Sequence, residues 1–279
     1  MKSFFKKTIA AATAAVMTLS VTAISALAAV GDVNLSGKTN SQDARMLLRY
    51  SAHLETLTDE QLAKADLNYD GRVNSSDARI LLRAVAKLEN LEYYSNFYSE
   101  IVDSEGVSMA FGVYNKNVYM ETDALGAKLA IVIGADGSFT FIDTANKRYA
   151  VLTAAEIKTF ETIASGAGES FSFSDILQDE SVQEQMTIPK PLKLQEDGYV
   201  KNTGTWLGKE VSTYTKGNDV YYYDGGQILG NSTGSGRTAV TIAYKNFTTS
   251  PANKIYAHLN GGYAKVDFLE MIMSLSIDF

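Results

Sequence analysis

The chain has 279 residues, a formal net charge of −7, 46% hydrophobic and 20% charged residues, and no Cys. This composition is that of a globular protein; it excludes a disordered chain, collagen and a coiled coil, and the length suggests two domains. The lack of Cys excludes disulfides, thiolate zinc sites and cysteine nucleophiles, so a metal would need oxygen or histidine ligands. An acidic surface without a basic run argues against nucleic acid and anionic membranes as partners.

Residues 1–29 have the three parts of a secretory signal peptide. A start with three Lys precedes an apolar stretch over residues 8–27, and Ala26-Leu27-Ala28 is a small-x-small cleavage motif. The alternative is an uncleaved membrane anchor, but no stop-transfer charges follow the apolar stretch. We expect a mature chain with no membrane anchor, 22 basic and 32 acidic residues, and a net charge of −10.

A repeated loop comes next, beginning at Asp32 and again at Asp66, and each copy leads into a nearly identical helix. Both copies follow the EF-hand pattern, with side-chain oxygens at positions 1, 3, 5, 9 and 12, a carbonyl oxygen at position 7 and Gly at position 6. An isolated match could be an Asx turn, but two matches in register favour two calcium sites. The predicted ligands are Asp32, Asn34, Ser36, Lys38 (carbonyl), Asn40 and Asp43, and then Asp66, Asn68, Asp70, Arg72 (carbonyl), Asn74 and Asp77.

Residues 31–90 resemble the type I dockerin, a small all-α module with two EF-hand-like calcium loops. The resemblance implies two calcium ions as cofactors and a cohesin domain of a scaffoldin as partner, within a cellulosome-like complex that degrades polysaccharides. Both loops end in Asp where the ordinary EF-hand has Glu. Ser36 replaces the acidic or amide residue usual at position 5, so the first site has two carboxylates against three and should bind calcium more weakly.

The resemblance also places the cohesin-binding positions, and because the two halves are alike, either half is expected to be able to face the cohesin. Serines and Arg side chains would donate hydrogen bonds there, while Leu side chains would supply apolar contact. The positions are Ser41, Gln42, Leu48 and Arg49 in the first half, and Ser75, Ser76, Leu82 and Arg83 in the second. Four neighbours on the same helices should instead pack in the core: Met46, Leu47, Ile80 and Leu81.

The remaining residues, 91–279, consist mainly of short alternating segments that predict an antiparallel sheet. Two helices are expected in this part, at 153–164 and 174–185. In the preceding module we expect a short helix at 58–62, between the two loops, and a helix after the second loop that runs through Leu88. No Pro/Ser/Thr-rich linker precedes Leu91, so the two domains should be close neighbours. The predicted strands are 107–111, 117–121, 128–133, 138–142, 147–151, 207–214, 220–223, 239–244 and 254–257.

Three segments, 142–149, 222–229 and 255–263, give this part a likeness to the LolA-like lipoprotein-carrier fold. The likeness implies an α+β domain dominated by an antiparallel sheet, shaped as an open half-barrel over helices. A concave face of this kind could hold an acyl chain or an apolar peptide, but the favoured interpretation is that the same side chains pack in the core against the helices. The candidate slot residues are Met109, Phe111, Met120, Phe139, Phe141 and Trp206.

The domain plan is thus a signal peptide at 1–29, a dockerin at 30–90 and a β-rich domain at 91–279. No catalytic motif supports an enzyme, and His258 is expected to be structural rather than catalytic. The favoured function is a secreted, extracellular component that is held at the cell surface through its complex and carries a non-catalytic ligand-binding domain. A divergent glycoside hydrolase acting on plant polysaccharide and a carbohydrate-binding accessory are the alternatives. Trp206 and the Tyr221–Tyr223 run could stack on sugars, but Tyr222 should face the opposite side of its strand from Tyr221 and Tyr223.

Overall fold

The computed structural model describes residues 29–104, 106, 108–124, 127–166, 187–235 and 240–274. The expected signal peptide and the expected helix at 174–185 lie outside these residues. The chain divides into two compact units, which are described separately. The loop unit consists of the described residues within 29–94 and 188–241. The strand unit consists of the described residues within 95–187 and 242–279. No helix within the described ranges is both long and apolar enough to cross a membrane.

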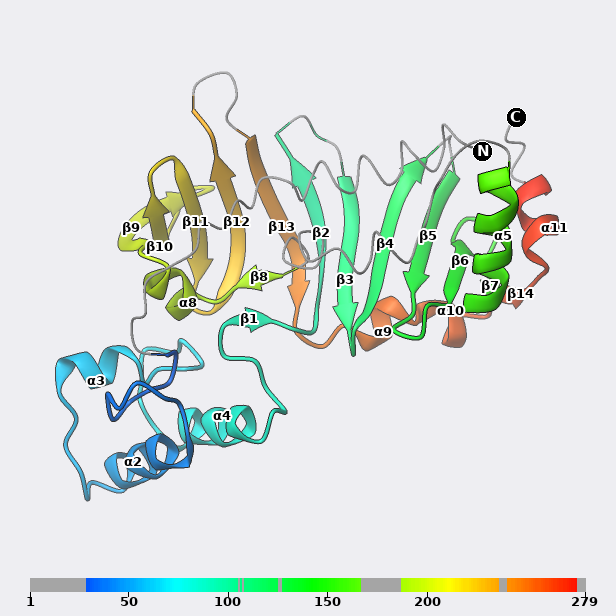
Figure 1. Cartoon of the computed structure of the whole chain (residues 1–279). Helices are drawn as coiled ribbons and strands as arrows, with labels where there is room; N and C mark the ends of the chain where they lie inside the picture. The colour runs from blue at the N-terminus through cyan, green and yellow to red at the C-terminus, as the bar shows by residue number, and fades with distance from the viewer. Residues whose placement is uncertain are drawn as a thin grey trace. The chain divides into compact units, whose positions relative to one another are not determined.

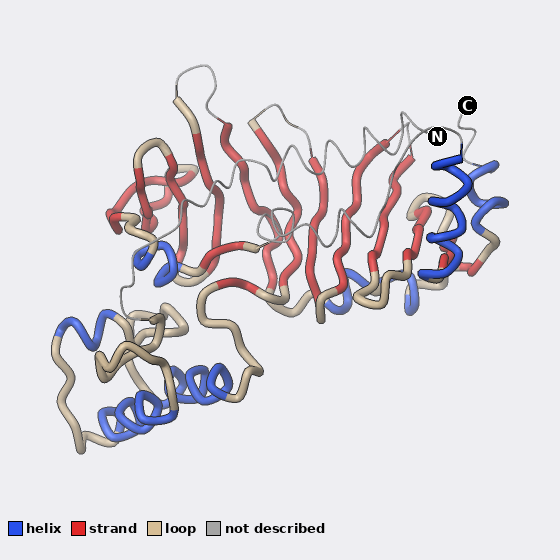
Figure 2. The backbone as a smooth tube through the Cα atoms, in the orientation of Figure 1, coloured by secondary structure: helices blue, strands red, loops and turns tan. Residues whose placement is uncertain are grey.

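The described strands form an open twelve-stranded sheet and a separate two-stranded ladder, β1-β8 (Figures 1 and 2). The larger sheet has the order β14-β7-β6-β5-β4-β3-β2-β13-β12-β11-β10-β9, and β14 runs parallel to β7. This confirms the expected small helical module followed by a part dominated by an antiparallel sheet.

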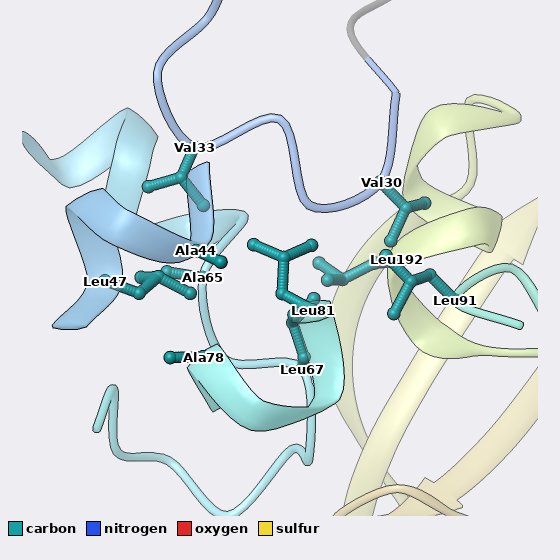
Figure 3. Packing of buried hydrophobic residues seen from close by; sticks show 10 residues of the cluster. All are labelled: Val30, Val33, Ala44, Leu47, Ala65, Leu67, Ala78, Leu81, Leu91 and Leu192. Atoms are coloured by element: carbon teal, nitrogen blue, oxygen red, sulfur yellow. The ribbon is translucent and has the colours of Figure 1, made fainter. Parts of the chain in front are cut away.

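The loop unit begins with three helices: α2 (Ser41–Ser51), α3 (Asp59–Ala63) and α4 (Ser75–Val85). Helix α3 agrees with the short helix expected at 58–62, and its cap is Thr58. Leu47 and Leu81 occupy equivalent places on α2 and α4 and are fully buried, because the repeated Ala-x-x-Leu spacing puts one small and one large apolar side chain on the inner face. Figure 3 shows this core, to which both halves of the repeat contribute buried apolar side chains.

The rest of the loop unit is a short helix and a set of hairpins. Tyr223 is fully buried on one sheet face, where its hydroxyl donates to the Pro189 carbonyl. Leu207 and Gly208 have positive φ angles, as the tight turn between the first two hairpin strands requires. The elements are β1 (Tyr93–Tyr94), β8 (Ile188–Pro189), α8 (Pro191–Glu196), β9 (Val200–Trp206), β10 (Lys209–Lys216), β11 (Asp219–Asp224) and β12 (Gln227–Thr233).

The first strands of the strand unit form a meander of consecutive antiparallel hairpins, as the alternating sequence predicts. On one sheet face, Tyr98, Tyr119 and Ile142 form a core with Ile255. On the other, Phe141 contacts Phe268, with ring centroids 4.8 Å apart. The elements are β2 (Phe97–Asp103), β3 (Ser108–Tyr114), β4 (Asn117–Ala124), β5 (Ala127–Ile133), β6 (Phe139–Asp143), β7 (Arg148–Leu152), α5 (Ala154–Gly166), β13 (Val240–Thr248), α9 (Ala252–Ile255), α10 (Ala257–Asn260), β14 (Ala264–Lys265) and α11 (Phe268–Ser274).

Some expected elements differ from the structure. The strand expected at 207–214 begins only at Lys209, because Leu207 and Gly208 form the turn that precedes β10. Helix α4 ends at Val85 instead of continuing through Leu88, because Lys87 takes a positive φ of 59° and the Leu88 amide donates to the Arg83 carbonyl, which closes a Schellman motif. Residues 254–257, expected as a strand, instead contain the end of α9, the capping residue Tyr256 and the start of α10. There the Pro251 carbonyl accepts the amides of residues 254 and 255, and this starts a helical turn.

Candidate functional site: two oxygen-rich loops and an exposed helix face

The first loop is held in shape by two buried carboxylates. Asp32 accepts hydrogen bonds from the backbone amides of Ser36 (2.9 Å) and Gly37 (2.7 Å). Asp43 accepts from the amides of Asn34 (2.9 Å) and Asn40 (2.8 Å), so its two oxygens tie the start of the loop to its end. Both carboxylates have 0% relative exposure. The loop is therefore folded around the same oxygens that the sequence assigns to metal positions 1 and 12.

The second loop repeats this arrangement. Asp66 accepts from the amides of Asp70 (3.1 Å) and Gly71 (3.0 Å). Asp77, which is fully buried, accepts from the amides of Leu67 (2.9 Å), Asn68 (3.2 Å) and Asn74 (2.9 Å). Apart from the bond from Leu67, the two loops share these bonds position by position, so the repeat seen in the sequence is a repeat of geometry.

Each loop also starts its helix. Asn40 and Asn74 are the N-caps of α2 and α4, and in both helices the Asp at the third position bonds back to the cap amide to complete a capping box. The loop-closing carboxylates, Asp43 and Asp77, are thus also capping residues, and a negative charge in the first helical turn is favourable. Loop closure and helix initiation depend on the same two side chains.

The chemistry of the donor set fits calcium. The ligand positions offer only oxygen: carboxylates, amides, a hydroxyl and one carbonyl per loop. In the first loop, Ser36 Oγ and Asn40 Nδ2 lie 3.2 and 3.1 Å from the Lys38 carbonyl oxygen, so three of the proposed ligand groups already lie together. Gly37 and Gly71 have φ angles of +85° and +80°, as the sharp bend at position 6 requires.

The two loops differ in the number of carboxylates at their ligand positions, with two in the first and three in the second. Burial, and the nearby carboxylates of Asp77 and Asp70, raise the pKa of Asp66 despite amide hydrogen bonds that oppose the shift. Within the described ranges, no three His, Cys, Asp or Glu side chains form a metal-binding group, so neutral oxygens would have to complete each site. A bound calcium ion would supply the positive charge that these crowded carboxylates lack. The second loop, with three carboxylates, is the stronger candidate.

The expected docking positions lie on the surface in both halves. Leu48 and Leu82 are each 43% exposed, although both are apolar. Ser41, Gln42, Arg49, Ser75 and Arg83 are exposed, and Ser76 is partly buried. Of the four neighbours expected in the core, Leu47 and Leu81 are fully buried, and Met46 and Ile80 are partly buried against that core.

Comparison with known proteins decides what this module is. Residues 30–86 match the family model of the dockerin type I domain. This part of the chain is a type I dockerin. Type I dockerins bind calcium, and the match supports docking onto a cohesin of a cellulosome-type scaffold. No curated protein matches the chain.

The two halves of the dockerin are not fully equivalent. Arg49 Nε lies 2.8 Å from Glu55 Oε2, whereas the corresponding pair, Arg83 and Glu89, is 3.8 Å apart. Glu89 also lies 3.3 Å from the ammonium nitrogen of Lys190, which precedes α8. Sequence reasoning about the dockerin missed Lys190, because it lies about a hundred residues further along the chain and belongs to no motif.

The residues of the candidate slot fall into two groups. Phe111 pairs with Met120 across β3 and β4, and Ile131 of β5 pairs with both Met120 and Phe141, so these residues share one sheet face. Met109 and Phe139 lie two residues from Phe111 and Phe141 and share that face. All except the partly buried Met120 are at most 7% exposed, which fits the core alternative raised by the sequence. Trp206 lies on β9, in the loop unit.

Two further side chains singled out by the sequence have defined surroundings. His258 is 6% exposed and lies 5.1 Å, ring centroid to centroid, from Tyr149. Burial lowers its pKa, although a hydrogen bond with the backbone of Ile255 opposes the shift. Trp206 lies 4.7 Å from Tyr222 by the same measure, on the sheet face opposite Tyr223. Sequence reasoning separated Tyr222 from its two neighbours, but it did not pair Tyr222 with Trp206.

Proposed function

We propose that the protein is a secreted, extracellular component of a cellulosome-like, polysaccharide-degrading complex. Its dockerin, residues 30–90, binds two calcium ions through the twelve loop residues and docks onto the cohesin of a scaffoldin. Residues 91–279 are the β-rich cargo, with a non-catalytic ligand-binding role, and residues 1–29 are the signal peptide. The observation that carries the proposal is the repeated loop geometry, with equivalent exposed side chains on both α2 and α4.

The docking face is tested with Asp substitutions at Leu48 and Leu82. If either half can dock, each single variant should bind cohesin within about twofold of wild type, because the other half remains intact. The double variant should lose at least about thirtyfold in affinity, since a charge then replaces an apolar contact in both orientations. Calorimetric titration with cohesin, in calcium and again in EGTA, measures these affinities.

Leu269→Asp is the matched control, because Leu269 is 64% exposed on α11 and lies outside the dockerin. Wild-type affinity in the double variant would refute the docking face. Complete loss in one single variant would show that only that half docks.

A second candidate function, carbohydrate binding by the cargo, is favoured by the Trp206–Tyr222 pair. Both rings are partly exposed, and the adjacent Leu207 is 92% exposed. Next to the pair, Lys209 and Asp224 form an ion pair that offers hydrogen-bonding groups at the rim. Aromatic faces with polar neighbours are suited to stacking on sugar rings.

If the cargo binds glycans, wild-type protein should be depleted from solution by insoluble glucan, and Trp206→Ala should reduce that depletion at least about fivefold through loss of ring stacking. The exposed Leu259→Ala, at 59% relative exposure on α10, serves as the control for nonspecific adsorption. Equal depletion of wild type and Trp206→Ala would exclude this face as the binding site.

A further inference from the structure

The two calcium loops differ at position 4, between the ligands at positions 3 and 5. The first loop has Leu35 there, 39% exposed, and the second has Tyr69, which packs against the dockerin core. Both residues take the same left-handed backbone conformation, with φ angles of 59° and 61°. The loops therefore place equivalent side chains at this position, but only the Tyr contacts the core.

The Tyr69 side chain contacts the cargo part of the loop unit. Its hydroxyl lies beside the backbone of Leu192 in α8. Leu192 itself belongs to the dockerin core, together with Leu91 and Leu81 (Figure 3). The hydrophobic core of the dockerin is thus completed by a residue that follows it by about a hundred positions.

The turn between β11 and β12 fits closely against the same loop. A Cβ atom placed on Gly226 would lie 2.8 Å from Tyr69 Cδ2 and 3.5 Å from the carbonyl oxygen of Asn68. One placed on Gly225 would lie 3.3 Å from the Tyr69 carbonyl oxygen. Two consecutive glycines are therefore what allows the hairpin turn to approach the backbone of the second calcium loop. Tyr94 adds a hydrogen bond from its hydroxyl to the Gly226 carbonyl.

A buried cation fixes α8 beside these contacts. Lys190 is 8% exposed, and its ammonium group donates to the Asn90 carbonyl (2.6 Å) and to Glu89 (3.3 Å). It also lies 5.5 Å from the centre of the Tyr94 ring. Because a buried ammonium is stable only with such partners, these bonds hold the segment after α4 against the start of α8.

We propose that Tyr69 couples the second calcium site to the β9–β12 part of the cargo. Its flanking residues, Asn68 and Asp70, are ligands in the proposed site, so a bound ion would fix the Tyr69 backbone and hold its ring against α8 and the Gly225–Gly226 turn. Calcium in the second loop then stabilises these hairpins, and by linkage the hairpins raise the calcium affinity of that loop. The first loop has the exposed Leu35 instead and is not coupled in this way. This inference rests on the proposed calcium sites.

The test follows the unfolding of the hairpins through Trp206, the single Trp of the chain, which lies on β9. Residues 30–279 are unfolded in urea with calcium chloride or with EGTA, and calcium affinities are measured by chelator competition. Calcium should raise the urea midpoint of the Trp206 transition in wild type. Tyr69→Ala should weaken the tighter calcium site about tenfold and remove the calcium-dependent shift. The matched variant Leu35→Ala should change neither.

Two milder variants keep the proposal testable if Tyr69→Ala fails to fold. Asp70→Asn should lower the Trp206 midpoint in calcium, whereas Ser36→Ala, at the same loop position in the first half, should not. If the protein binds two calcium ions but the urea midpoint of the Trp206 transition does not change with calcium, the coupling is wrong while the proposed calcium sites are retained. If no calcium binds, both are wrong. Equal effects of the Tyr69 and Leu35 variants would also overturn the coupling.

Discussion

Replacing Asp43 and Asp77 together with Ala should abolish calcium binding and cohesin docking. Each carboxylate is fully buried, stands at the proposed metal position 12, and completes a capping box with the N-cap Asn. Its removal takes away a proposed metal ligand and half of a capping box, and it leaves two or three backbone amides without their acceptor. A lost cap costs about 1 kcal/mol and each unsatisfied amide about 1–3 kcal/mol. A module of this size has only a few kcal/mol of stability, so the dockerin should not fold.

Calorimetric titration of the double variant with calcium and with cohesin checks this, together with its far-UV circular dichroism in saturating calcium. The control is Asp59→Ala with Glu60→Ala, which removes the same charge from exposed positions in the first turn of α3. That control should bind cohesin with wild-type affinity. Intact cohesin binding by the Asp43/Asp77 variant would contradict the docking function proposed for the dockerin.

The dockerin could be predicted from sequence because its structure depends on short-range spacing. The EF-hand pattern fixes which oxygens lie near one another, and the Asn and Asp residues at the loop ends fix where α2 and α4 begin. The burial of Leu47 and Leu81 follows from the helical period. The hydrogen bonds that shape each loop join residues at most ten positions apart, so the spacing in the sequence determines which groups meet.

Where partners are distant in the chain, prediction from sequence was weaker. Leu192 completes the dockerin core, and Lys190 pairs with Glu89, although no local pattern connects either residue with the loops. The Gly225–Gly226 turn approaches Tyr69 of the second loop, and no local pattern connects these two segments either. Residues 254–257 have a composition that suits a strand, and the hydrogen bonds to the Pro251 carbonyl make them helical instead. Tertiary packing also acts on this segment, since Ile255 is fully buried in a core with Tyr98 and Tyr119.

The cargo contains one buried ion pair whose loss should be costly. Asp143, at the end of β6, has a fully buried side chain, and its Oδ2 lies 2.7 Å from an Nη2 atom of Arg148, at the start of β7. Asn146, in the turn between them, donates its backbone amide (3.0 Å) and its side-chain amide (2.8 Å) to the same carboxylate. Burial alone would raise the pKa of Asp143, but the hydrogen bonds from Arg148 and Asn146 outweigh it, so the pKa is lowered.

Arg148→Met should therefore destabilise the protein by about 3 kcal/mol at neutral pH, because it leaves a buried carboxylate without its cation. In wild type the Asp143 pKa is below its unfolded value, so its stabilising contribution is present above that value and is lost as the pH falls. In the variant, burial without Arg148 raises the pKa, and the carboxyl can take up a proton as the pH falls. The difference from wild type should thus be largest at pH 8 and smaller at pH 5.

Urea unfolding at the two pH values, followed by circular dichroism, measures this difference. Lys209→Met is the matched control, since Lys209 pairs with Asp224 and both side chains are exposed, at 63% and 47%. Breaking that surface pair should cost less than about 1 kcal/mol at either pH. An Arg148→Met effect as small as the control's would show that the Asn146 donors suffice to hold the charge. An effect that grows towards pH 5 would show that the ionised Asp143 is not the source of the cost.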